Sequence, residues 1–339
     1  MRAVTVVLAA SVSFGLAAAP DARWSGAHAA GRDAGEQRVP QPAEIWRRIF
    51  ARPQTIPAPD DNPLTPPKIE LGRALFHDVR LSGDRRRSCA TCHDPVKGFA
   101  DGLRRAAGRD GTNLPRNTPA LWNLAWARHL FWDGRAESLE AQAKVPIIHP
   151  NELAGNLTKT AAALNRDSVM KGRFARAFRD AGGASPENIL SALASYERSL
   201  VSPPTKFDHW LSGDPRALNR TEYEGFRLFT GKAGCLQCHG GWRFTDDRFH
   251  DIGLDTTDLG RNAFAGASAD SPAHKTPGLR GVAGTAPYMH DGSKPSLESV
   301  VEHYAVSLIR RPSLATQLKR RPPLSSADQA ALVAFLKTL

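Results

Sequence analysis

All four cysteines of this 339-residue chain stand in two copies of the pattern Cys-x-x-Cys-His. The copies consist of Cys89, Cys92 and His93 in the first half, and of Cys235, Cys238 and His239 in the second. At this spacing two thiols form thioethers to the vinyl groups of one haem, and the histidine faces the iron as a ligand. Disulfides, zinc sites and redox dithiols also use cysteine pairs, but none of them explains a histidine after both pairs. The motifs therefore predict two covalently bound haem c groups.

The segments around the two motifs repeat one another. Matching patterns are Gly-x-x-Leu-Phe at 72–76 and 225–229, Phe-x-Asp at 99–101 and 244–246, Thr-Pro-x-Leu at 118–121 and 276–279, and Asp-Gly-x-x-x-Ser-Leu-Glu at 133–140 and 291–298. This duplication predicts an N-terminal haem domain over residues 67–210 and a C-terminal haem domain over residues 211–339. The boundary is expected near 203–215, where prolines and glycines cluster.

Helix signals dominate the remaining sequence. Ser185 and Pro186 are typical of a helix start, residues 221–229 predict a helix closed by Gly231, and residues 326–339 predict an amphipathic closing helix. Thr118 is expected to cap a helix that has Pro119 in its first position. We therefore expect a mainly α fold made of two duplicated haem domains with long loops.

The N-terminus is typical of an export signal. Arg2 precedes an almost wholly apolar run over residues 4–19, and small residues suitable for cleavage follow. We expect a signal peptide over residues 1–30, an extended lead-in over residues 31–66 and a periplasmic protein that contacts the membrane only through the export signal. The alternative is a retained anchor, for which the apolar run is short.

The net charge of +11 bears on which partners the protein could bind. Basic residues are scattered and no aromatic-basic motif is present, so binding to nucleic acid is not expected. Two interpretations of the charge remain: a basic surface that steers acidic redox partners, or a basic exported protein with no special partner.

The repeat also compares the two irons. Aligned on Ser-Leu-Glu, Gln142 matches Val300 and Pro146 matches Tyr304. A phenolate oxygen ligates iron, whereas proline has no ligand atom. If these segments cover the distal sides of the haems, the first iron is open and the second is filled. Met289, His290 and His303 compete with Tyr304 as the sixth ligand of the second iron. His290 matches Trp132, so it is expected to be structural or to contact haem rather than to ligate iron.

Together these residues resemble the bacterial di-haem cytochrome c peroxidase family, including its methylamine-utilisation MauG branch. The resemblance runs from about Leu71 to the C-terminus and includes the segments at residues 131–136 and 287–292. It implies two mainly helical, cytochrome c-like domains with one calcium ion between them. Asn117, through its side-chain amide, and Thr285 and Pro287, through backbone carbonyls, fall where the family holds calcium.

The resemblance also implies catalytic roles. Trp132 corresponds to the tryptophan between the haems, and Gln142 and Glu152 correspond to the polar pair over the peroxidatic haem. Glu152 would take a proton from hydrogen peroxide bound at the His93 haem and deliver it to the leaving oxygen. Without the resemblance, Glu152 would be interpreted as a solvated loop carboxylate and Gln142 as a residue on a helix surface. Trp132 would be interpreted as a side chain that only packs against haem.

Two departures separate this chain from particular branches. Classical members carry a histidine between the first motif and the Asn-x-Pro segment, and residues 94–116 contain none. Like MauG, the chain has a tyrosine where classical members have an axial methionine, at Tyr304. Unlike MauG, it has Ala233 where a tryptophan just before the second motif relays electrons.

Three functions follow from these patterns. The first is reduction of hydrogen peroxide with electrons from a small redox protein, either cytochrome c or a cupredoxin. The second is MauG-type, peroxide-dependent oxidation of residues on a partner protein. The third is a non-enzymatic di-haem electron carrier, which the open position opposite Pro146 disfavours.

Overall fold

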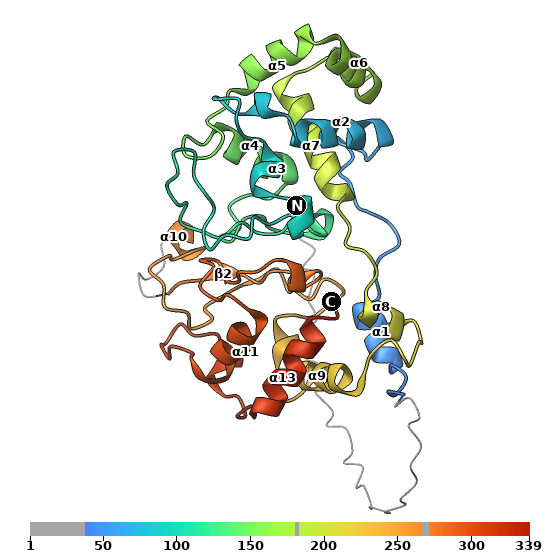
Figure 1. Ribbon diagram of the computed structural model, residues 1–339, viewed down its shortest axis with the longest axis vertical. Coiled ribbons are helices and arrows are strands. Elements are labelled where there is room, and N and C mark those ends of the chain that lie inside the picture. Colours follow the sequence, from blue (N-terminus) through green and yellow to red (C-terminus); the bar gives the residue numbers. More distant parts are fainter. Residues whose placement is uncertain (1–37, 180–182, 266–270) are drawn as a thin grey trace, which may run out of the picture. The chain divides into compact units, whose positions relative to one another are not determined.

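The computed structural model describes residues 38–179, 183–265 and 271–339. The predicted signal peptide, residues 1–30, and the first residues of the predicted lead-in lie outside this part. The described chain is mainly helical with long loops, as predicted, and its sheet consists of two short antiparallel strands (Figure 1). No helix in these ranges is both long and apolar enough to cross a membrane.

The helices and strands follow one another along the chain with irregular segments between them. The α-helices are α1 (Glu44–Phe50), α2 (Pro66–Phe76), α3 (Cys89–Cys92), α4 (Leu139–Ile148), α5 (Leu157–Arg166), α6 (Ser168–Ala177), α7 (Pro186–Ser199), α8 (Lys206–Leu211), α9 (Arg220–Thr230), α10 (Asn262–Ala265), α11 (Leu297–Val306), α12 (Thr316–Lys319) and α13 (Ser326–Leu336). The strands are β1 (Phe249–His250) and β2 (His274–Lys275), and 3-10 helices span Val79–Leu81, Pro95–Lys97, Leu124–Trp126, Cys235–Gln237 and Val282–Gly284.

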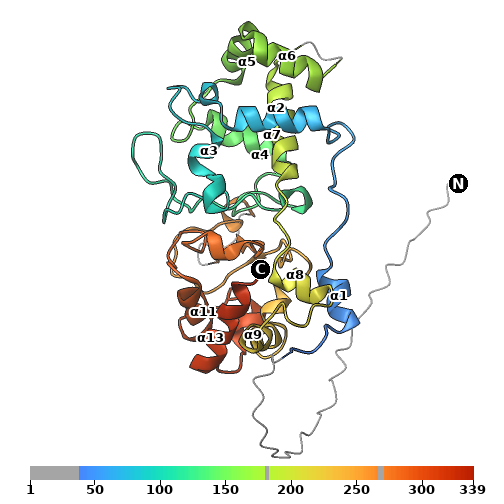
Figure 2. The ribbon, with the colours of Figure 1, turned by 45° about the vertical axis from the view of Figure 1, so that its right-hand side comes forward.

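Buried apolar side chains form two main clusters, one in each half. The first joins α2, α4, α5, α6 and α7, and the second joins α1, α8, α9, α11 and α13. Figures 1 and 2 both show α1 beside α8, against the C-terminal half. The prediction of an extended lead-in over residues 31–66 is therefore wrong at Glu44–Phe50, where a helix buries Phe50 in the second cluster. Phe207 and Trp210, which were expected in the first domain, also pack in the second cluster.

The sequence duplication is repeated in the way the helices pack. Helix α2 crosses α7 at Gly72, where an added Cβ would lie 1.9 Å from the Ala192 backbone oxygen. Helix α9 crosses α13 at Gly225, where an added Cβ would lie 1.9 Å from the Ala331 oxygen. Only glycine allows backbones to approach so closely, so the same contact explains the same residue in both halves.

The predicted helix boundaries hold where local chemistry decides them. The Ser185 hydroxyl accepts a hydrogen bond from the Asn188 backbone N–H at the start of α7, and Gly231 follows the last residue of α9. The helix expected after Thr118 does not form. The Thr118 hydroxyl instead donates to Asp101, at 2.7 Å, and only a short 3-10 helix follows, at Leu124–Trp126.

Polar contacts join the two halves near Trp132. Arg116 pairs with Asp133 of its own half and with Asp258 of the other, at 2.6 Å in the second case. The Lys275 backbone N–H donates to the Trp132 oxygen at 2.8 Å. These contacts position the cavity that lies between the two cysteine-histidine motifs.

Candidate functional site

Both cysteine-histidine motifs open into one cavity of about 1140 Å³. Cys92 and His93 line it from the N-terminal half, and Cys235, Cys238 and His239 line it from the C-terminal half. In the first motif, a capping box at Ser88 starts helix α3, which carries both cysteines. This turn brings Cys92 and His93 to the cavity, whereas Cys89 lies on the same turn but is not among the lining residues. Thioether attachment of haem would use both thiols.

The two motif histidines are oriented in the same way. His93 Nδ1 lies 3.0 Å from the Phe99 backbone oxygen, and His239 Nδ1 lies 2.8 Å from the Phe244 oxygen. Each contact fixes the ring and leaves Nε2 available for a metal, which is the usual arrangement for a metal-binding histidine. Burial lowers the pKa of both imidazoles, which favours the neutral form that binds iron.

Two buried guanidinium groups in the cavity wall each have one nitrogen without an acceptor, although Arg280 also pairs with Asp208 at 2.8 Å. The Arg280 Nη2 and Arg321 Nη1 atoms are buried and have no hydrogen-bond partner among the described residues. Lys275 also lines the cavity, where burial lowers its pKa. Haem carries two propionate carboxylates, and buried guanidinium nitrogens without acceptors are donors that would bind them. The donor set, the oriented histidines and these cations all fit haem.

The residues predicted to cover the first iron do meet in the cavity. Gln142 and Pro146 lie one turn apart on α4, and both line it together with Glu152. Burial raises the pKa of the Glu152 carboxyl, against the opposing effect of the His149 and Arg135 charges. His149, interpreted from the sequence as an ordinary histidine, also lines the cavity, with Nδ1 3.6 Å from Glu152 Oε1.

The matching helix α11 covers the other end of the cavity. Val300 and Tyr304 line the cavity from α11, at the positions equivalent to Gln142 and Pro146. Among the competing ligands, Met289 also lines the cavity. His303 does not, and its Nε2 lies 2.9 Å from the Ile252 backbone oxygen.

Arg321 is the residue near Tyr304 that sequence reasoning missed. Its guanidinium carbon lies 5.8 Å from the centre of the Tyr304 ring, and its Nη2 lies 3.7 Å from Cys235 Sγ. Burial raises the pKa of the Tyr304 phenol, whereas the Arg321 charge lowers it. Nothing in the repeat indicates Arg321, because it lies in an irregular segment between α12 and α13.

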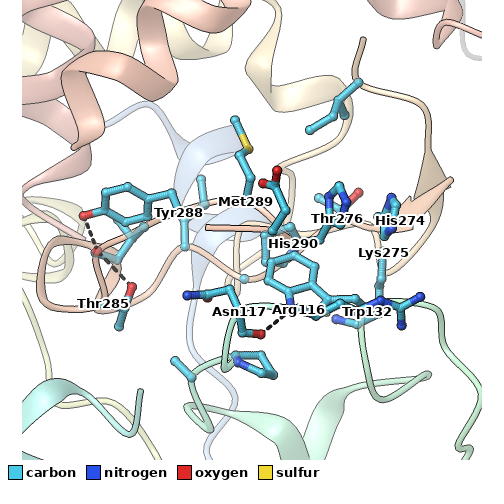
Figure 3. Close-up of a pocket in the computed structure, with 18 of the residues that line it drawn as sticks. Arg116, Asn117, Trp132, His274, Lys275, Thr276, Thr285, Tyr288, Met289 and His290 are labelled. Atoms are coloured by element: carbon cyan, nitrogen blue, oxygen red, sulfur yellow. Dashed lines mark hydrogen bonds between the residues drawn. The ribbon is translucent and has the colours of Figure 1, made fainter. Parts of the chain in front are cut away.

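Trp132 lies where the two halves meet. Its indole N–H donates to the Asn117 backbone oxygen at 3.0 Å, and its ring centre lies 6.5 Å from that of His290 (Figure 3). His290 stacks on His274 with ring centres 3.6 Å apart, and burial lowers the pKa of His290 to about 4. His290 Nε2 lies 3.2 Å from the Thr256 hydroxyl, so this ring packs against neighbours in the wall.

The residues expected to hold calcium also line the cavity. The Asn117 amide nitrogen donates to the Leu103 oxygen at 2.8 Å, and the Thr285 hydroxyl donates to Val282 at 3.1 Å. Among the described residues, none donates a hydrogen bond to the Asn117 side-chain oxygen or to the backbone oxygens of Thr285 and Pro287. Free amide and carbonyl oxygens are suitable calcium ligands.

A family model and the most similar relatives agree on one protein family. The family model described as di-haem cytochrome c peroxidase matches residues 66–216. The chain is 46% identical to methylamine utilization protein MauG of Methylorubrum extorquens, over 93% of this chain and 89% of that protein. It is 34% identical to cytochrome c peroxidase Ccp of Escherichia coli, over 94% of this chain and 70% of that protein.

A solved structure extends the comparison to three dimensions. The crystal structure of a MauG-like protein associated with microbial copper homeostasis matches with a TM-score of 0.76 and 31% identity. The match covers 86% of this chain and 95% of that one. Both the sequence relatives and this structure therefore include the two motif regions that line the cavity.

Proposed function

Because this chain belongs to the di-haem cytochrome c peroxidase family, we propose that it reduces hydrogen peroxide to water beside His93. Electrons would come from a small redox protein, cytochrome c or a cupredoxin, through the His239 side of the cavity. The family consists of oxidoreductases that use two c-type haems. Cys89, Cys92 and His93 would hold one of these haems in this chain, and the second motif would hold the other.

The observation that carries the proposal is the asymmetry between two equivalent helices. On α4 a proline, Pro146, faces the cavity, and on α11 the equivalent residue is Tyr304. Haem supplies a redox-active iron that binds small molecules where a coordination position is open. Pro146 would leave such a position open on the His93 side, whereas the Tyr304 oxygen would be the ligand on the His239 side.

The residues on the open side are suited to moving a proton. Glu152 would accept the proton of the nearer peroxide oxygen and return it to the oxygen that leaves as water. The raised pKa of its carboxyl brings this exchange closer to neutral pH, where a general base is most effective. The Gln142 amide would orient the peroxide by hydrogen bonding, and the complete reduction consumes two electrons and two protons.

Trp132 would provide the connection between the two sides. Its indole is fixed by the hydrogen bond to Asn117, and its backbone oxygen binds the C-terminal half through Lys275. A rigid aromatic ring at this point would shorten the path for electrons between the haems. A calcium ion held by Asn117, Thr285 and Pro287 would fasten the two halves together beside it.

MauG-type oxidation of a partner protein is the second candidate. Its support is the 46% identity to a protein of that name, higher than the 34% to the peroxidase of Escherichia coli. Against it stands Ala233, which is 1% exposed, in place of the tryptophan expected just before the second motif for that reaction. For either enzyme, residues 1–30 would direct export to the periplasm.

Electron paramagnetic resonance of the haem-loaded ferric protein tests the asymmetry. We expect one high-spin signal and one low-spin signal, and Tyr304→Met should change only the low-spin signal. Tyr288→Phe is the matched control, because Tyr288 also lines the cavity but donates its hydroxyl to Val282. Two low-spin signals that are insensitive to Tyr304→Met would refute the proposal.

Turnover separates the two enzymes. Steady oxidation of reduced cytochrome c by hydrogen peroxide would support the peroxidase. Peroxide consumption without oxidation of any small redox protein would instead favour the MauG-type reaction.

A further inference from the structure

Two tryptophans from opposite halves of the chain touch outside the cavity. The rings of Trp126 and Trp242 meet edge to face, with centres 4.7 Å apart and an interplanar angle of 83°. Both residues are half-buried, and neither lines the cavity. Each ring therefore combines contact with the other half and access to solvent.

The pair lies close to both motif regions. Trp242 follows His239 by three residues, so their Cα atoms are at most about 11 Å apart. The Trp242 backbone oxygen accepts a hydrogen bond from Arg280 Nε at 2.8 Å, and Arg280 lines the cavity. Trp126 ends the 3-10 helix Leu124–Trp126, whose first residue also lines the cavity. The pair thus forms the outer side of the cavity wall.

We propose that the Trp126–Trp242 pair is the site where an external one-electron donor protein delivers electrons to this enzyme. This inference rests on the proposed reduction of peroxide, which leaves two oxidising equivalents in the cavity. Indole is among the most readily oxidised side chains, and rings in van der Waals contact exchange electrons over a short distance. The halves meet at the pair, so either haem can draw electrons from it.

Each electron transfer balances at the indole. One electron leaves the Trp242 ring toward the cavity, and the ring N–H proton leaves to solvent. The donor protein then returns one electron, and the nitrogen regains a proton from water. Two such cycles supply the two electrons that one peroxide molecule consumes.

The other described tryptophans are less suited to this role. Trp132 and Trp122 line the cavity, where the Trp132 N–H is bonded to Asn117. Trp210 is 1% exposed in the C-terminal core. Trp46 is half-buried and meets Phe226 edge to face at 5.4 Å, but Phe226 is a core residue outside the cavity lining. Trp46 is therefore a matched control with similar exposure and a similar ring contact.

The first experiment needs no donor. Haem-loaded protein is treated with hydrogen peroxide alone, and oxygen addition to each tryptophan is measured by peptide mass spectrometry. We expect oxidation at Trp126 and Trp242 on the order of tenfold above that at Trp46, and Trp242→Phe should also lower the labelling of Trp126. Equal labelling of Trp46, or unlabelled rings in protein that consumes peroxide, would overturn the inference.

The second experiment measures turnover with reduced cytochrome c. Trp242→Phe and Trp126→Phe should each lower kcat on the order of tenfold, while Trp46→Phe should not. The rate of the first peroxide reduction, measured by stopped flow, should be unchanged in all three variants. Normal kcat in both pair variants would overturn the inference and leave the proposed function intact. Native protein that consumes no peroxide would overturn both.

Discussion

Gly225 has no room for a methyl group at the crossing of α9 and α13. An added Cβ would lie 1.9 Å from the Ala331 backbone oxygen and 2.7 Å from the Phe335 Cβ. Because an ordinary contact is at least about 3.4 Å, Gly225→Ala would force the helices apart by about 1.5 Å. Overpacking of this size should cost about 3 kcal/mol of the free energy of unfolding. The matching change, Gly72→Ala, meets the Ala192 oxygen at the same distance and should cost a similar amount.

Thermal unfolding of the haem-loaded protein, followed by circular dichroism, measures this cost. We expect Tm to fall by about 5 °C in each variant, because an unfolding entropy of about 2.1 cal/mol/K per residue gives about 1.6 °C per kcal/mol for roughly 300 residues. Gly172→Ala is the control, because in α6 its added Cβ meets only Arg176 Nη1, at 3.8 Å. Alanine there should stabilise the helix by about 0.5–1 kcal/mol. An unchanged or raised Tm for Gly225→Ala would refute the argument that close backbone packing selects glycine.

Three further predictions concern the cavity and the junction of the halves. Glu152→Gln should lower kcat/KM for peroxide by roughly 10²–10⁴-fold. The activity of the native enzyme should fall as pH drops through the raised pKa of Glu152. The pH profile of the variant should lack this acid-side decrease. Arg116→Met should cost about 3 kcal/mol in denaturant unfolding, because it leaves Asp133 and Asp258 without this cation. Both carboxyls have lowered pKa values, so their contribution to the free energy of unfolding is complete above the ordinary value of 3.8 and is lost as pH falls below it. The variant should therefore lose less stability than the native protein when the pH is lowered through this range. Asn117→Ala should lower the calcium content measured by mass spectrometry from about one ion per chain toward none.

The sequence predicts most of the cavity because repeats and short motifs encode local geometry. The spacing of each motif places its thiols and imidazole on one turn, whatever the surrounding fold. Alignment of the repeats then brings Pro146 and Tyr304 to equivalent helices, and both line the cavity. Each motif spans four residues from its first cysteine to its histidine, and Pro146 and Tyr304 each lie six residues after the glutamate of the aligned segment, so tertiary packing has little freedom to change these relations.

The parts that escaped prediction depend on packing between distant segments. Helix α1 lies in a proline-rich stretch, and it is stabilised by burying Phe50 against Phe207 and Phe244, far along the chain. Arg280 and Arg321 enter the cavity from irregular segments, where periodicity gives no signal. Thr118 has the sequence of a cap, but its hydroxyl binds Asp101 instead, which draws the following residues into the cavity wall.

The backbone repeat also bears on the choice between Met289 and Tyr304. Met289 adopts a φ of 72°, and the equivalent residue of the first half, Phe131, adopts 66°. This left-handed conformation is uncommon outside glycine, so its recurrence indicates a turn shared by both halves. In the first half the turn places Phe131 under the Arg135 guanidinium, whose carbon lies 3.7 Å from the ring centre. Phenylalanine has no ligand atom, so the turn does not depend on iron ligation. The unusual backbone of Met289 is therefore explained without ligation. Tyr304 is the stronger ligand candidate, because it brings an oxygen to the position where the equivalent helix has Pro146.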